Sequence, residues 1–284
     1  MTPPAAIGGL AALAGAFDVF LIDQFGVLHD GHRAFPGAIE ALTNLKAAGK
    51  TTIILTNSAK RSAANTARLI SLGFSRACFG QVVSSGEAAH AGIAEHRFGP
   101  KFVPGARAYV IGRRGDDYGL EALGLHMASS PETADILLIL GTDAPAASPQ
   151  RYRELLAAAA ERDIPALCAN PDKLMFAAAG IAPAPGAIAD IYAELGGSVI
   201  FVGKPYPALY QFAMKPFPET APPRVLAIGD SIEHDIAGAS RMGYRSLLIR
   251  GGVLAGMGEA QLANFCAQHR TRPDYVLEQL IWAA

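Results

Sequence analysis

Short apolar runs alternate with longer amphipathic segments along this chain. The runs are brief, contain many branched or aromatic side chains, and are bounded by glycine or polar residues, which is typical of buried parallel strands. Amphipathic helical patterns separate many of them, so the alternation predicts an α/β fold with a mostly parallel, Rossmann-like sheet. The clearest runs lie at residues 18–23, 51–56, 108–112, 134–140, 198–203 and 224–230.

Residues 36–48 illustrate the helical pattern. Ile39, Leu42 and Leu45 share one face at helical spacing. Pro36 suits the first helical position, and Gly49 suits the C-terminal cap. The segment therefore predicts an amphipathic helix between the first two strands.

The stretch 4–22 is apolar except for one charge, Asp18, so a signal peptide or a membrane helix has to be considered. No Lys or Arg precedes this stretch, which is rich in glycine and alanine, and its end, DVFLID, has the pattern of a buried strand. We therefore predict an N-terminal helix followed by the first core strand, no membrane partner, and a cytoplasmic protein.

Bulk composition narrows the class of protein. The 284 residues exceed the usual size of one compact core, which favours two domains or one domain with a large insertion. A net charge of −1 and a pI of about 6.7 give no bulk attraction to nucleic acid. Cys78, Cys168 and Cys266 lie far apart without a CxxC pair, which predicts buried free thiols in a reducing compartment.

Polar side chains follow four of the predicted strands, at the sheet edge where ligands bind in parallel sheets. Asp23 ends the first run and precedes Gly26. A carboxylate there is either a nucleophile for phosphoryl transfer or a residue that caps the turn. Thr56, Asn57 and Ser58 stand at the start of a predicted helix, where they form either an anion site or an ordinary cap.

Charged residues follow the last two runs. Lys204 lies between Gly203 and Pro205 and suits phosphate as a point charge, although most lone lysines are merely solvated. Asp230 ends a strand and Asp235 lies in the first turn of the next helix, where two carboxylates suit Mg²⁺ or serve as helix caps. All four strand ends together predict a site for phosphoryl chemistry.

This set of motifs resembles the haloacid dehalogenase superfamily, and within it the class IIA hydrolases with a C2-type cap. That branch includes nitrophenyl, phosphoglycolate, pyridoxal and sugar phosphatases. The stretches CANPD and GTD resemble cap elements of the branch, and we expect Asn170 and Asp172 in an ordered loop rather than against substrate. The resemblance rests on DQFGVLHDG at 23–31, LTNSAKRS at 55–62, GKP at 203–205, GDSIEHD at 229–235, CANPD at 168–172 and GTD at 141–143.

The resemblance implies a catalytic core of residues 1–98 and 199–284 with a smaller α/β cap of residues 99–198 inserted into it. It also implies a magnesium-dependent phosphatase that acts on a small phosphorylated metabolite, and cap-mediated dimers among relatives make a homodimer an expectation. Asp23 would attack phosphorus and bind Mg²⁺. The other implied roles are metal binding by the Phe25 backbone carbonyl, Asp230 and, in support, Asp235, and phosphate binding by Thr56, Asn57, Ser58 and Lys204.

Motif I departs from the family pattern at one position. Phosphatases of this superfamily carry a second Asp two residues after the nucleophile, which protonates the leaving group, but this chain has Phe25 there. General acid–base help is worth ~10²–10⁴-fold in rate. His29, in the same loop, titrates in a suitable range and is the first candidate for a substitute catalytic acid, with His32 as a weaker one.

Phe25 is also compatible with two alternative functions. Dehalogenases of the superfamily carry an aromatic residue there as well, but they have lost the metal carboxylate, whereas this chain retains Asp230 and Asp235. Alternatively, the protein turns over slowly and binds a phosphorylated ligand as a sensor or a partner. The phosphatase is the hypothesis that the motifs favour.

Overall fold

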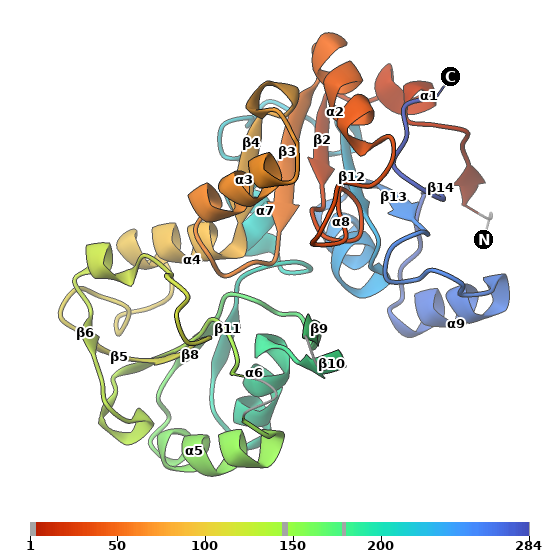
Figure 1. The fold of residues 1–284 in the computed structure, drawn as a ribbon. Helices are drawn as coiled ribbons and strands as arrows, with labels where there is room; N and C mark the ends of the chain where they lie inside the picture. The colour runs from red at the N-terminus through yellow and green to blue at the C-terminus, as the bar shows by residue number, and fades with distance from the viewer. Residues whose placement is uncertain (1–3, 144–146, 178–179, 284) are drawn as a thin grey trace. The chain divides into compact units, whose positions relative to one another are not determined.

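The computed structural model describes residues 4–143, 147–177 and 180–283. The chain separates into two compact units, each with its own parallel sheet and hydrophobic core (Figure 1). The first unit comprises residues 1–56, 63–83 and 204–284, and the second comprises residues 57–62 and 84–203.

A parallel sheet of seven strands forms the centre of the first unit. Its middle strands pair so that Ile22 lies opposite both Ile228 and Ile54, which brings the carboxyl ends of three strands to one edge. In spatial order the strands are β1 (Ala5–Ala6), β14 (Tyr275–Leu277), β13 (Arg245–Ile249), β12 (Val225–Gly229), β2 (Val19–Ile22), β3 (Thr51–Thr56) and β4 (Gln81–Ser84).

Apolar side chains cover both faces of this sheet, as its near-continuous hydrophobic strands require. Leu247 and Ile249 point into a core with Leu42 of α2, whereas Leu248, between them, packs on the other face with Leu262 of α9. The helices are α1 (Ala11–Ala14), α2 (Ala38–Ala47), α3 (Ser62–Ser71), η1 (Arg76–Cys78), α7 (Pro207–Met214), η4 (Pro222–Arg224), η5 (Ile232–Ile236), α8 (Ala237–Met242) and α9 (Glu259–Gln268).

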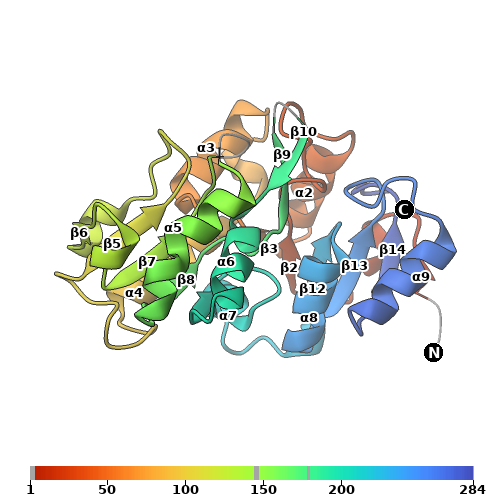
Figure 2. The same cartoon turned by 90° about the horizontal axis from the view of Figure 1, so that it is seen from below.

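The second unit contains a five-stranded parallel sheet and a separate antiparallel hairpin. Figure 2 shows α5 and α6 beside β7 and β8, and their buried side chains share one core with those strands. The sheet order is β11 (Val199–Phe201), β8 (Ala166–Cys168), β7 (Ile136–Ile139), β5 (Arg107–Ile111) and β6 (His126–Met127). The other elements are α4 (Ser85–Ala94), η2 (Leu120–Leu123), η3 (Pro131–Thr133), α5 (Pro149–Glu161), β9 (Leu174–Ala177), β10 (Gly180–Pro183) and α6 (Pro185–Glu194).

The predicted α/β class with parallel sheets is confirmed, and each of the six runs contains a strand. The division between the units differs from the expected boundary at 98/99, because α4 groups with the second unit. Ala89 and Ile93 of this helix border the same small cavity as Leu138 and Leu167, on the sheet face opposite α5 and α6. Because α4 contacts the second sheet, the chain enters the second unit between residues 83 and 84. It returns to the first unit between residues 203 and 204.

One local detail also differs from the sequence prediction. The helix predicted at 36–48 begins at Ala38, because Gly37 takes a positive φ of 82° as its N-cap and leaves Pro36 outside. Gly49 has a φ of 71° just beyond the helix end, as expected for a capping glycine. The apolar stretch 4–22 contains the short helix α1 and strand β2. None of the helices in the described part of the chain has the length and apolarity that crossing a bilayer demands.

Candidate active site

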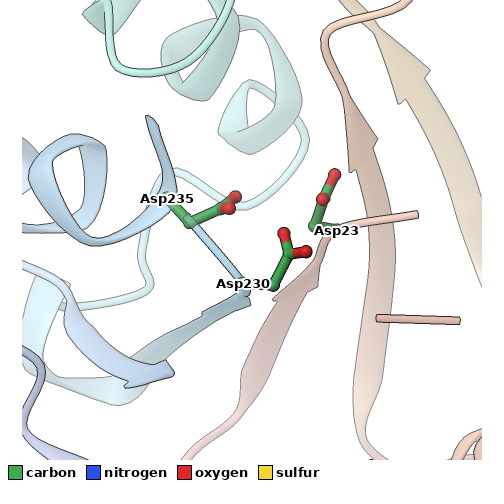
Figure 3. Close-up of side chains that lie close together, drawn as sticks. All are labelled: Asp23, Asp230 and Asp235. Atoms are coloured by element: carbon green, nitrogen blue, oxygen red, sulfur yellow. The ribbon is translucent and has the colours of Figure 1, made fainter. Parts of the chain in front are cut away.

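Three carboxylates gather at the carboxyl edge of the first sheet. Asp23 follows β2, Asp230 follows the neighbouring strand β12, and Asp235 lies in the turn after it (Figure 3). Each offers an oxygen atom, and these oxygens lie within 4.8 Å of one another. The amide of Asp23 donates to the carbonyl of Ile228 at 2.8 Å, which continues the strand pairing to the nucleophile candidate itself.

Lys204 joins two of the three carboxylates. Its ammonium group donates to Asp23 Oδ1 at 2.5 Å and to Asp235 Oδ1 at 2.7 Å. The side chains of Lys204 and Asp235 are each 5% exposed, and that of Asp23 is 11% exposed. Three carboxylates with one ammonium leave an excess of negative charge in a place with little water.

Other backbone groups fix the second and third carboxylates. Asp230 Oδ2 accepts from the Val253 amide at 2.7 Å, and Asp235 Oδ2 accepts from the Ser231 amide at 3.2 Å. Asp235 belongs to η5, a π-helical turn in which the amide of Ile236 donates to the carbonyl of Ser231. Such wide turns occur frequently at functional sites.

Three glycines leave space for these carboxylates. A Cβ atom on Gly26 would lie 1.9 Å from Asp230 Oδ2, and one on Gly252 would lie 2.1 Å from the same oxygen. A Cβ on Gly229 would lie 1.9 Å from Cγ of Asp235. A side chain at any of these positions would displace a carboxylate, so the glycines are required for the cluster to form.

Burial and mutual repulsion raise the pKa values of Asp23 and Asp230. The pKa of Asp23 is raised well above its ordinary value, chiefly by burial. Lys204 lowers this pKa, whereas the other two carboxylates raise it further. Burial and then Asp235 raise the pKa of Asp230 to about 7. A divalent cation would relieve this repulsion, and clustered carboxylate oxygens are the ligands that Mg²⁺ takes.

The residues after β3 are placed differently from the sequence prediction. Thr56 ends β3 and is buried, but α3 begins only at Ser62, so Asn57 and Ser58 lie in a loop and not at a helix start. Asn57 Nδ2 donates to Asp172 Oδ1 at 2.8 Å, and the Ser58 carbonyl accepts from the Gly86 amide at 3.0 Å. These contacts tie the loop to other residues of the second unit.

The CANPD stretch forms an ordered loop, as expected. The Asn170 side chain accepts from the Asp172 amide at 3.0 Å, which fixes the turn. Asp172 in turn accepts from Asn57. Gly203 has a φ of 136° and lies close to this loop. A Cβ atom on Gly203 would lie 2.4 Å from Cδ of Pro171 and 2.9 Å from Oδ1 of Asn57.

His29 is poorly suited to the role of proton donor that the sequence indicates for it. The side chain is 3% exposed, its Nδ1 accepts from the Gly31 amide at 3.0 Å, and its Nε2 lies 3.1 Å from the amide nitrogen of Gln24. Burial, and secondly Arg68, lower the pKa of His29 to about 4. The ring is therefore neutral at pH 7, and local partners occupy both of its nitrogens.

The neighbouring amide explains how the neutral ring is held. Because Nδ1 accepts a hydrogen bond, the ring proton lies on Nε2 and points at the Gln24 side chain. Gln24 Oε1 has no partner in its present orientation among the described residues. Turning the amide over lets Nε2–H of His29 donate to Oε1, which satisfies both groups. His29 thus fixes the loop after Asp23.

Sequence reasoning missed several residues of the site. Gly252 and Val253 come from the loop after β13, and only the side-by-side placement of β12 and β13 brings them to Asp230. Tyr210 of α7 is 1% exposed, and its charge interactions with Lys204 and Asp235 place it beside the cluster. The Gly251–Gly252 pair is the one local signal that points to such a close approach.

The sequence of this chain matches family profiles and curated relatives. The profile described as haloacid dehalogenase-like hydrolase matches residues 20–126, and a second profile of HAD-like hydrolases matches residues 201–283. Chronophin from Bos taurus is 30% identical over 95% of this chain and 93% of its own length.

Solved structures give the same assignment. A haloacid dehalogenase-like hydrolase from Brucella suis 1330 is 29% identical, with a TM-score of 0.82, over 99% of this chain and 100% of that one. Glycerol phosphate phosphatase from Mycobacterium tuberculosis in complex with calcium is 26% identical, with a TM-score of 0.70, over 94% of this chain and 74% of its own. From the matched profiles, the full-length relatives and the shared fold, we conclude that this chain belongs to the family of haloacid dehalogenase-like hydrolases.

Proposed function

We propose that this hydrolase is a magnesium-dependent phosphatase that removes the phosphoryl group of a small phosphorylated metabolite through an aspartyl-phosphate on Asp23. The observation that carries the proposal is the cluster of Asp23, Asp230 and Asp235, whose oxygens lie within 4.8 Å of one another beside Lys204. Nucleophile, cation and metal carboxylates in one buried place are the parts that phosphoryl transfer requires.

The metal fits the residues present. Asp23, Asp230 and the backbone carbonyl of Phe25 would hold Mg²⁺, with Asp235 in support, and the excess negative charge of the cluster favours a divalent cation there. When bound, the ion would supply charge stabilisation for the transferring phosphoryl group. The glycerol phosphate phosphatase from Mycobacterium tuberculosis is in complex with calcium, which supports the binding of a divalent cation by this protein.

The protein's own groups would carry the chemical steps. An oxygen of Asp23 attacks phosphorus, and Lys204 neutralises charge on that carboxylate and on the phosphoryl oxygens. We assign the remaining phosphoryl contacts to the Thr56 hydroxyl and to the backbone amides of Asn57 and Ser58. The side chain of Asn57 is committed to Asp172, which leaves its backbone amide as the group for phosphate.

The proposal also covers the role of the second unit, the oligomeric state and the cellular compartment. We propose that residues 84–203 act as the substrate-specifying cap, in place of the expected 99–198, and that the protein forms a homodimer. Cys78, Cys168 and Cys266 are free and buried, which fits the reducing cytoplasm. We propose no nucleic-acid partner, because the net charge is −1.

The relatives support a phosphatase over the two alternatives. The names of the curated relatives include D-glycerol 3-phosphate phosphatase from Mycobacterium tuberculosis, 28% identical over 94% of this chain. Carbon–halogen cleavage needs no metal carboxylates, whereas Asp230 and Asp235 are retained and buried. A phosphate-binding sensor is the remaining alternative, and turnover separates it from an enzyme.

The test is phosphate release from acetyl phosphate and from p-nitrophenyl phosphate, with Mg²⁺ and with EDTA. We expect Mg²⁺-dependent release by the wild type, and a loss of ~10³-fold or more in Asp23→Asn, since an amide is a far poorer nucleophile. Asp18→Asn is a matched control, because Asp18 precedes the same strand and pairs with Arg224 on the surface. Release that is unchanged in Asp23→Asn, or absent in the wild type, would contradict the proposal.

A further inference from the structure

An exposed aromatic ring lies two residues after the candidate nucleophile. The side chain of Phe25 is 41% exposed, although most large apolar side chains of the described chain are buried. Gln24, between Phe25 and Asp23, is 4% exposed and points inward to His29. The chain thus turns Gln24 into the protein and leaves the Phe25 ring accessible two residues after the candidate nucleophile.

The ring is fixed in place by its own loop. The rings of His29 and Phe25 meet edge to face at a centroid distance of 6.0 Å, and a Cβ atom on Gly31 would lie 3.2 Å from Phe25 Cε2. Arg68 of α3 donates to the carbonyl of Gly31 and so ties the loop to the core. An exposed ring on a tied loop offers a preformed flat surface, so its contacts with a ligand require little ordering.

Two polar side chains of this loop, His29 and Asp30, are not available for the missing proton transfer. Both ring nitrogens of His29 have local partners. Asp30 is held as a carboxylate by the amides of His32 and Arg33, at 2.8 and 2.9 Å. Without help from either group, the leaving oxygen departs as an anion, and a delocalised anion departs most readily.

We propose that Phe25 selects aryl phosphates: the substrate has a planar aromatic leaving group that stacks on the Phe25 ring and departs as a phenolate. This inference rests on the proposed phosphatase function and names its substrate class. The same substitution removes the proton donor and supplies the stacking surface, since aromatic pairs prefer offset or edge contacts with each other.

The reaction balances without an enzyme acid. An Asp23 oxygen forms a bond to phosphorus while the bond from phosphorus to the aryl oxygen breaks, and the electron pair goes to that oxygen and into the ring. The phenolate takes a proton from solvent after it leaves. Water then attacks phosphorus, the bond to Asp23 breaks, and the proton of the attacking water passes to the phosphate product, so aryl phosphate and water give phenol and phosphate.

The first experiment compares kcat/KM for phenyl phosphates whose ring substituents lower the phenol pKa stepwise, and for an alkyl phosphate. We expect the rate to fall steeply as the leaving group becomes more basic, and the aryl substrates to exceed the alkyl one by ~10²–10⁴-fold or more, the usual worth of a general acid. A flat series, or an alkyl phosphate turned over as fast as the aryl ones, would overturn the proposal.

The second experiment isolates the contact with the ring. We expect Phe25→Leu to raise KM for p-nitrophenyl phosphate ~2- to 12-fold, while Phe25→Tyr retains the wild-type value. Acetyl phosphate, which has no ring, is the reference: the ratio of the KM for p-nitrophenyl phosphate to the KM for acetyl phosphate should rise in Phe25→Leu and stay constant in Phe25→Tyr, so that any effect of the substitution on the metal site cancels. An unchanged aryl KM in a folded Phe25→Leu protein, verified by its thermal midpoint, would overturn the stacking role.

Acetyl phosphate also separates this inference from the proposed function. Its leaving group needs neither a proton nor an aromatic surface. If Mg²⁺-dependent hydrolysis of acetyl phosphate occurs but the aryl preference is absent, only the substrate class is wrong. If acetyl phosphate is not hydrolysed, the phosphatase itself is wrong.

Discussion

At the scale of single residues, the site combines groups that phosphoryl transfer needs with one that it cannot use. Asp23 and Lys204 form a buried ion pair at 2.5 Å, whereas Phe25, two residues on, cannot move a proton. Asp23 and Asp230 follow neighbouring strands of the first sheet, which explains why they meet, whereas Lys204 follows β11, a strand of the second unit's sheet. The sequence could not indicate that His29 is buried and neutral, since that depends on Gln24, Gly31 and Arg68 folding around the ring.

Restoring an acid at position 25 tests whether its absence limits the rate. We expect Phe25→Asp to raise kcat for an alkyl phosphate ~10-fold or more over Phe25→Asn, because Asp can protonate the alkoxide and Asn cannot. The two variants have side chains of nearly equal size, so steady-state kinetics of the pair isolates the proton. Equal rates in both folded variants would mean that the alkyl reaction is not limited by the missing acid.

Gly26 offers a test of the space around the carboxylates. It has a φ of 85°, and a Cβ there would lie 1.9 Å from Asp230 Oδ2. We expect Gly26→Ala to lower the free energy of unfolding by ~1–3 kcal/mol because of the left-handed backbone, and by a further ~1–3 kcal/mol because of overpacking. Its thermal stabilisation by Mg²⁺ should also disappear.

Gly49→Ala is the matched control for this variant. Gly49 also has a positive φ, of 71°, but among the described residues, its chain neighbours aside, no heavy atom lies within 4 Å of the position that its Cβ would take. Gly49→Ala should therefore lose only the part of the unfolding free energy that comes from the left-handed backbone. It should still be stabilised by Mg²⁺ against thermal unfolding. Equal melting temperatures of the two variants would show that the loop yields to the methyl group at no cost.

At the scale of elements, β2 and β12 set the site by pairing Ile22 with Ile228, so that the next residues, Asp23 and Gly229–Asp230, emerge together. Apolar runs bounded by polar residues were sufficient to predict these strands. They were insufficient for the π-helical turn η5 and for the loop at 251–253, because both depend on contacts between strands that are distant in sequence. Nor did the pattern reveal that α4 packs on the second sheet.

The pKa of Asp230 at the end of β12 predicts how pH and metal are linked. Its folded value of about 7 lies above the ordinary value, because of burial and Asp235. In the metal-free protein its proton therefore contributes stability that is fully present below about pH 4 and is lost as pH rises through about 7. Mg²⁺ competes with that proton for the carboxylate.

The increase in melting temperature on adding Mg²⁺ should accordingly be larger at about pH 8 than at about pH 5.5. Differential scanning fluorimetry with Mg²⁺ and with EDTA across this range measures it. Asp230→Asn should remove most of the pH dependence of the increase. A shift of the same size at both ends of the range would show that Asp230 does not exchange its proton for the metal.

At the scale of the whole molecule, two units with separate cores divide the work that we propose. The carboxylates, Lys204 and Phe25 all belong to the first unit, and the loop with Asn57 and Ser58 belongs to the second. The alternation of strands and helices predicts the α/β class, and the family resemblance implies an α/β cap inserted between the second and third motifs. The exact membership of α4 and of the 57–62 loop depends on packing against the second sheet, which local patterns do not encode.

The central claim is that Asp23 becomes phosphorylated during turnover. The direct measurement is mass spectrometry of peptides from enzyme that was mixed with Mg²⁺ and acetyl phosphate and quenched rapidly in acid. The account predicts one added phosphoryl group on the peptide that contains Asp23, and none in EDTA or in Asp23→Asn. Turnover of acetyl phosphate with this peptide unmodified, or with the phosphoryl group on another residue, would contradict the account.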